Sequence, residues 1–146
     1  GFNPELQVTP LFRESFYMIC SEGSDYPELV NPHDLDMSQE INVSQRREVQ
    51  VWNDYWFGSD ARPLLNTDTM QLADAWPPTS RVWAAAPAIA AEHMRRAKIC
   101  RFTAQPPDRI SYLIAPRAVE LPREAALFLE DLRWELQQHP DVTVYF

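Results

Sequence analysis

Small polar side chains follow two short apolar stretches of the 146-residue sequence. The stretch NVSQR contains Val43, Ser44 and Gln45, and the stretch LNTDT contains Asn66 and Thr67. Each stretch lies where a predicted strand passes into a predicted helix, beside backbone N–H groups that have no helical partner. Such a place suits a carboxylate or another polar small molecule. Ser44 and Thr67 also suit ordinary helix capping, so both interpretations stay open.

Other residues that could do chemistry form weaker patterns. Only three glycines are present, which argues against a Gly-rich phosphate loop, a dinucleotide fingerprint and a nucleophile turn. The histidines, His33, His93 and His139, have no second His or Cys at ligand spacing, which argues against a metal site. Asp34 and Asp36 beside His33 could form an acid–base cluster, although capping of solvated turns is the favoured interpretation. We therefore expect no catalytic residue, no metal and no cofactor.

The composition is that of a folded, acidic chain. Hydrophobic residues make up 45% of it, which predicts one domain with a substantial core. The formal net charge of -8 argues against binding a nucleic-acid backbone unaided. No apolar run approaches the ~20 residues that span a bilayer, and no export signal is evident. We expect a cytoplasmic protein without membrane contact. Cys20 and Cys100 lie in apolar segments and are interpreted as buried, reduced thiols, with a redox pair or a disulfide as the alternative.

Segments of strand and helix character alternate along the chain. The predicted strands are 6–12, 15–21, 40–44, 62–67, 80–87, 99–103 and 109–116, and the predicted helices are 45–58, 68–76, 88–98 and 121–136. This alternation favours the α/β class, with a Rossmann-like or flavodoxin-like, mostly parallel sheet that carries helices on both faces.

Two of the predicted helices have unusual apolar faces. The first is aromatic from Val49 to Phe57 and ends at Gly58, and aromatic side chains concentrate at the centres of interfaces. We expect a homo-oligomer through this helix. The second has an apolar stripe at helical spacing but is followed by only a short tail, so its packing partner is an open question. The stripe comprises Leu121, Ala125, Phe128, Leu129, Leu132 and Leu136.

The order of the segments resembles the effector-binding domain of LysR-type transcriptional regulators, a periplasmic-binding-protein-like type II fold. The stretches that carry the resemblance are PLFRESFYMICSEGSDYP, LVNPHDLDMSQEINV, RPLLNTDTMQLADAWPPTSRVWAAAP and RISYLIAPRAVELPREAALFLEDLRWEL. Together they cover nearly the whole chain, from Leu6 to Leu136. One departure is ADAWPPTS, which replaces a Gly-rich loop of the family and puts the shape of that rim in doubt.

The resemblance implies a division of the chain into parts. Residues 6–20 would be the first crossover strands, residues 21–108 the second subdomain, and residues 109–146 the return crossover and closing helix. The family's helix-turn-helix and part of its first subdomain have no counterpart, so we expect a truncated effector-binding domain. DNA would then be bound only through an N-terminal domain that is not in this chain.

The resemblance also implies a function and a site. Members of the family bind a small effector in the cleft between two subdomains, and this binding modulates DNA binding. By position, Arg13 matches an arginine near the ligand, and Val43, Ser44 and Gln45 match a strand-to-helix turn that contacts the effector. The sheet argument adds Asn66 and Thr67, and these residues together suit a carboxylate or aromatic effector.

Two other functions are alternatives. One is a free-standing solute-binding protein, which the lack of an export signal argues against. The other is an enzyme on a flavodoxin-like sheet, whose best acid would be one of Asp34, Asp36 and Asp68.

Overall fold

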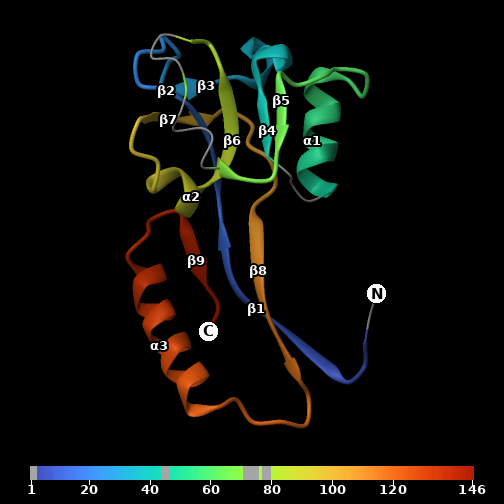
Figure 1. Ribbon diagram of the computed structural model, residues 1–146, viewed down its shortest axis with the longest axis vertical. Coiled ribbons are helices and arrows are strands. Elements are labelled where there is room, and N and C mark those ends of the chain that lie inside the picture. The colour runs from blue at the N-terminus through green and yellow to red at the C-terminus, as the bar shows by residue number, and fades with distance from the viewer. Residues whose placement is uncertain (1–2, 44–46, 71–75, 77–79) are drawn as a thin grey trace. The chain divides into compact units, whose positions relative to one another are not determined.

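The computed structural model describes residues 3–43, 47–70, 76 and 80–146, and these form two compact units. Unit 1 consists of residues 1–14 and 109–146, and unit 2 consists of Ser15–Asp108 (Figure 1). Within the described part of the chain, no helix is both long enough and apolar enough to cross a membrane.

Unit 1 is a small antiparallel sheet with one helix. Its elements are the strands β1 (Leu6–Glu14), β8 (Arg109–Pro116) and β9 (Val142–Val144) and the helix α3 (Arg123–Gln137). The strand order is β8-β1-β9, and a bulge between Pro10 and Phe12 shifts the register of β1 on β8. Figure 1 shows α3 beside β9. The alternating Val142 and Val144 thus supply a third strand to the sheet, which the tail's period-two pattern predicts.

The apolar stripe of α3 is only partly covered. Leu136 is buried, and Ala125, Leu129 and Leu132 are half-buried. Phe128, however, is 64% exposed, so the remaining strands cover only part of the stripe whose packing partner the sequence left open. A sheet of three strands, one of them three residues long, offers too little area to cover a helix of this length.

Unit 2 contains a mixed sheet with short helices. Its strands are β2 (Phe16–Ser21), β3 (Leu29–Val30), β4 (Ile41–Val43), β5 (Leu65–Thr67), β6 (Trp83–Pro87) and β7 (Ala97–Phe102). Its helices are η1 (Pro32–Asp34), η2 (Met37–Gln39), α1 (Arg47–Phe57) and α2 (Ala88–Glu92). The strands form two hydrogen-bonded sets, β3-β7-β2-β6 and β4-β5, and an isolated parallel bridge joins Glu40 to Trp83.

The direction of the strands corrects the sequence prediction. The α/β class is confirmed, but a mostly parallel sheet is wrong. β2 is antiparallel to both β6 and β7, whereas β3 is parallel to β7 and β4 is parallel to β5. The prediction of parallel strands from alternating segments assumes that a helix connects each strand to the next. Here β1 and β2 follow each other with no helix between them, and so do β7 and β8, so the rule does not fix their directions.

The core of unit 2 lies on both faces of β2. Tyr17 and Ile19 point into one apolar cluster and Met18 and Cys20 into another, as the period of two in a strand requires. Ala88 and Ala91 of α2 pack in the first cluster. In the second cluster Trp52 of α1 meets Trp83 and Phe102, and its ring is edge-on to that of Phe102 at a centroid distance of 5.2 Å. Helices therefore cover both faces of the strand, as predicted.

The helix predictions have different outcomes. The helix before Gly58 is confirmed, and Gly58 adopts a φ of 86°, the left-handed conformation that ends helices. The helix predicted at 88–98 ends at Glu92, because Ala97 and Lys98 pair with Ser21 and Cys20 as the start of β7. The helix predicted at 68–76 lies mostly outside the described residues.

Candidate functional site

The carboxyl ends of β4 and β5 bring three of the predicted site residues together. The two strands are parallel, with Asn42 opposite Asn66 and Val43 opposite Thr67. The side-chain amide of Asn42 donates a hydrogen bond to Oδ1 of Asn66 over 2.9 Å. The Val43 side chain is buried, whereas Asn66 is exposed. At this end of the two strands, Asn66 is therefore exposed and Thr67 is half-buried.

The Thr67 hydroxyl already takes part in a local turn. Its Oγ1 accepts a hydrogen bond from the backbone N–H of Thr69 over 3.2 Å. This arrangement is a Ser/Thr turn, the local form of the capping role that the sequence left open. The remaining predicted residues at this end, Ser44 and Gln45, lie outside the described residues.

Arg13 belongs to unit 1. It lies on β1, opposite Ile110 of β8 and Thr143 of β9, and it is exposed. Its neighbours in the chain have different environments, since Phe12 is half-buried and Glu14 is buried.

A buried carboxyl group, Glu40, was not identified from the sequence. Glu40 is 3% exposed and immediately precedes β4. Its Oε1 accepts a hydrogen bond from Nδ2 of Asn53 on α1 over 3.4 Å, while its buried Oε2 has no hydrogen-bond partner among the described residues. Burial disfavours the charged form and raises the pKa of Glu40 to about 7, although the Asn53 hydrogen bond acts in the opposite direction. A lone Glu before a short strand gives no signal of this in the sequence.

The two cysteines lie in neighbouring strands of unit 2. Both are buried and free, as predicted. Cys100 lies opposite Met18, two positions from Cys20 on the same face. The hydrogen bond between the two thiols lowers the pKa of Cys20 and, with burial, raises that of Cys100. The thiolate form is thus favoured on Cys20 and disfavoured on Cys100.

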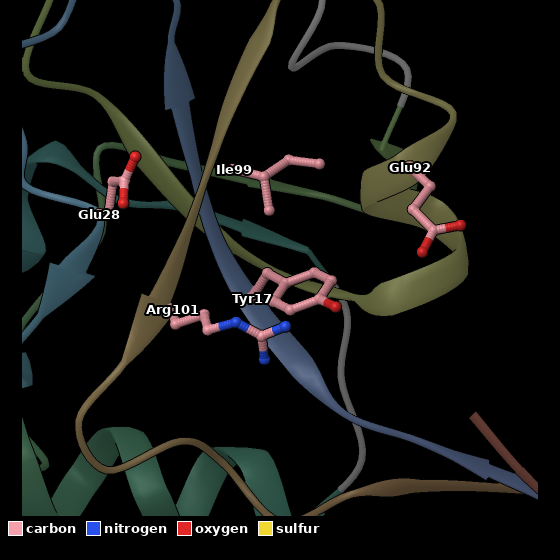
Figure 2. A pocket seen from close by; sticks show the side chains of 5 residues that line it. All are labelled: Tyr17, Glu28, Glu92, Ile99 and Arg101. Atoms are coloured by element: carbon pink, nitrogen blue, oxygen red, sulfur yellow. The ribbon is translucent and has the colours of Figure 1, made fainter. Parts of the chain in front are cut away.

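Unit 2 also has a small open pocket on the α2 side of its sheet, which we call the Tyr17 pocket. Its lining comprises Tyr17, Glu28, Glu92, Ile99 and Arg101, and its volume is about 260 Å³ (Figure 2). The alternation of side chains along β2 and β7 places Tyr17, Ile99 and Arg101 on one face of the sheet. The sequence could not reveal the pocket, because its charged residues come from three separate segments.

Of the residues considered for acid–base chemistry, Asp36 caps a helix, whereas His33 and Asp34 have exposed side chains. Asp36 caps η2 through Oδ1, which accepts hydrogen bonds from the backbone N–H and the hydroxyl of Ser38 over 2.9 and 2.7 Å. These hydrogen bonds lower the pKa of Asp36. Nδ1 of His33 lies 3.8 Å from Oδ1 of Asp34, and both side chains are strongly exposed. Among residues 3–43, 47–70, 76 and 80–146, no group of three or more His, Cys, Asp and Glu is arranged to hold a metal ion.

Comparison with known proteins gives similarity in structure only. No family model matches the sequence, and no curated protein matches it. HinK, a LysR-family transcriptional regulator from Pseudomonas aeruginosa, has a similar structure with a TM-score of 0.68 and 12% identity. The similarity covers 92% of this chain and 49% of HinK, so the chain spans about half the length of that regulator.

Two further structures have the same fold. Reduced OxyR from N. meningitidis matches with a TM-score of 0.65 and 17% identity, over 100% of this chain and 71% of that one. The effector-binding domain of QuiR in complex with shikimate matches with a TM-score of 0.60 and 14% identity, over 94% of this chain and 68% of that one. The chain therefore has the fold of the regulatory, effector-binding domains of LysR-type transcriptional regulators.

Proposed function

We propose that this chain is a ligand-sensing domain of a LysR-type transcription factor. The observation that carries the proposal is the fold, which is shared with an effector-binding domain that holds shikimate. Sensing requires only that a ligand bind two arrangements of the protein with different affinities. It requires no catalytic residue. Of the acids best placed for catalysis in the sequence, Asp34 and Asp68 are exposed and Asp36 caps a helix.

We propose that the effector is a small carboxylate or aromatic molecule. The residues proposed to bind it are Arg13, Val43, Ser44, Gln45, Asn66 and Thr67. The guanidinium of Arg13 is suited to a carboxylate, because it can donate two parallel hydrogen bonds. The exposed Asn66 offers an amide that is already oriented by Asn42, and Val43 can contribute backbone groups even though its side chain is buried.

In the proposed function, this domain acts together with a DNA-binding domain, a further part of the regulator and a second copy of itself. DNA would be bound by a helix-turn-helix outside this chain, which fits the net charge of -8. The large apolar side chains of α3 that stay exposed, Phe128 (64%) and Trp134 (61%), would be covered by a further part of the regulator. A homo-oligomer would form through the outer face of α1, where Val51 and Tyr55 are exposed one helical turn apart.

A thermal-shift screen of small carboxylates and aromatic acids, with shikimate included, tests the proposal. A ligand that binds only the folded state raises the melting temperature, and the increase grows with ligand concentration. The hit should then alter the DNA affinity of a longer protein that carries the helix-turn-helix. A hit that is converted to product by the chain would instead support the enzyme alternative. A hit that binds but leaves DNA affinity unchanged would support the solute-binding alternative.

A further inference from the structure

The Tyr17 pocket combines an apolar floor with charges of both signs. Tyr17 is buried in the sheet and presents its ring, and Ile99 is 41% exposed although it is a branched apolar residue in a strand. Figure 2 shows Ile99 and Tyr17 between the carboxylates of Glu28 and Glu92, with the Arg101 guanidinium close to the Tyr17 ring. An exposed aliphatic side chain bordered by charged groups is the arrangement of a small-molecule site.

The charges of the pocket select a class of ligand. Its lining carries two carboxylates and one guanidinium, a net charge of -1. A simple anion, such as phosphate or a lone carboxylate, would meet more repulsion than attraction there. A ligand that carries an ammonium group satisfies one carboxylate, and a ligand that also carries a carboxylate uses the guanidinium. The two carboxylates and the guanidinium of the pocket therefore favour a zwitterionic ligand.

The charged groups are held by the fold. The backbone N–H of Arg101 donates to the carbonyl oxygen of Glu28 over 2.7 Å, and the Arg101 guanidinium lies 5.2 Å from the centroid of the Tyr17 ring. Tyr17, Glu92 and Arg101 each make further interactions within the chain. The Arg101 guanidinium thus already has a defined position beside the Tyr17 ring, which lowers the entropic cost of ordering it around a ligand. A volume of about 260 Å³ limits that ligand to the size of a small metabolite.

We propose that the Tyr17 pocket binds a free amino acid with an aliphatic side chain. Arg101, which lies over the Tyr17 ring, receives the carboxylate, Glu92 receives the ammonium group, and the aliphatic side chain lies on the exposed Ile99. Glu28 then disfavours amino acids that carry a second acidic group. This site lies wholly within unit 2 and uses none of the residues proposed to bind the effector, so it does not depend on the proposed function.

Titration of the 146-residue chain with L-leucine, followed by amide chemical shifts in NMR spectra, tests the site. Matched ligands are isovalerate, which lacks the ammonium group, and isoamylamine, which lacks the carboxylate. L-Leucine should shift the signals of β7 around Ile99, and each analogue should bind at least about tenfold more weakly, as the loss of one charge-assisted hydrogen bond implies. L-Glutamate should also bind more weakly than L-leucine.

Variants then assign the contacts. Arg101→Gln and Glu92→Gln should each weaken L-leucine binding about tenfold, whereas Arg95→Gln, an exposed arginine outside the pocket, should leave it unchanged. Circular dichroism confirms that each variant is folded. The proposal is overturned if L-leucine shifts no signal near Ile99, if isoamylamine binds as tightly as L-leucine, or if Arg101→Gln has no effect.

Discussion

Asn53 on α1 donates its side-chain hydrogen bond to Oε1 of Glu40 over 3.4 Å, and both residues are 3% exposed. The second carboxyl oxygen of Glu40 is buried, and no residue that the structure describes forms a hydrogen bond with it. A buried carboxylate with one long hydrogen bond is poorly stabilised, so the neutral form is favoured in the folded protein. This relationship makes the stability of unit 2 depend on pH.

Glu40→Gln should remove a pH dependence from the stability of the chain. The folded pKa of Glu40, about 7, lies above its ordinary value of 4.5, so the folded state holds the proton more tightly than the unfolded state. The resulting stabilisation is complete below pH 4.5 and is lost as the pH rises through 7, a decline of about 3 kcal/mol in the free energy of unfolding. The neutral amide introduced by Glu40→Gln does not titrate, so the variant lacks this decline and should be the more stable protein at pH 8.

Urea denaturation of both proteins between pH 4.5 and 8 measures this difference. Glu48→Gln serves as the control, because Glu48 lies on the same helix as Asn53 but is exposed. Parallel pH profiles for the wild type and Glu40→Gln would show that Glu40 titrates normally.

Gly58→Ala should destabilise the chain by about 1 kcal/mol through the backbone alone. The φ of Gly58 is 86°. Apart from its chain neighbours, no described residue has an atom within 4 Å of the position that a Cβ would occupy, so steric clash is not the expected cause. Gly58→Asn should cost less, because Asn tolerates the left-handed conformation better than Ala. Equal losses for Ala and Asn in urea denaturation would argue against conformational strain as the cause.

Two apolar residues of α3 should respond very differently to truncation. Leu136 is 3% exposed and Phe128 is 64% exposed. Leu136→Ala should therefore cost about 2–5 kcal/mol, whereas Phe128→Ala in this chain should change stability by less than about 0.5 kcal/mol. Thermal unfolding followed by circular dichroism measures both. A large loss for Phe128→Ala would mean that the outer face of α3 is already covered, for example by a second copy of the chain.

Tyr55→Glu should weaken self-association without unfolding unit 2. Tyr55 is 78% exposed on α1, so a charge there meets only solvent in the monomer but is buried if copies associate through this face. Sedimentation velocity at matched concentrations should show a smaller species for the variant than for the wild type. Glu48→Gln, which also changes the charge by one at an exposed position of α1, is the control. An unchanged distribution for Tyr55→Glu would exclude this face as the interface.

Local features of the fold were predictable because local sequence determines them. The helix that ends at Gly58 follows from a helical period and a residue suited to positive φ. The strand at Phe16–Ser21 follows from a run of apolar and aromatic residues that is buried on both faces. Cys20 is buried because all of β2 is buried, whereas Cys100 is buried because it lies on the face of β7 that packs in the second cluster.

Non-local features were not predictable in the same way. Hydrophobic patterning does not specify strand direction, so the reversal of β2 between β6 and β7 was missed. The helix at Ala88–Glu92 was predicted too long, since pairing of Ala97 with Ser21 depends on a strand distant in sequence. The burial of Glu40 was missed for the same reason, because Asn53 and the strand neighbours bury it only after folding.

The central claim, that the chain senses a small effector, is tested most directly by titrating the hit of the ligand screen into matched variants. Isothermal titration calorimetry would compare the wild type with Arg13→Ala, Thr67→Ala and, as control, the exposed Arg62→Ala. We predict that affinity falls about tenfold or more for Arg13→Ala, falls for Thr67→Ala and is unchanged for Arg62→Ala. Unchanged affinity in both Arg13→Ala and Thr67→Ala would contradict the proposed effector site.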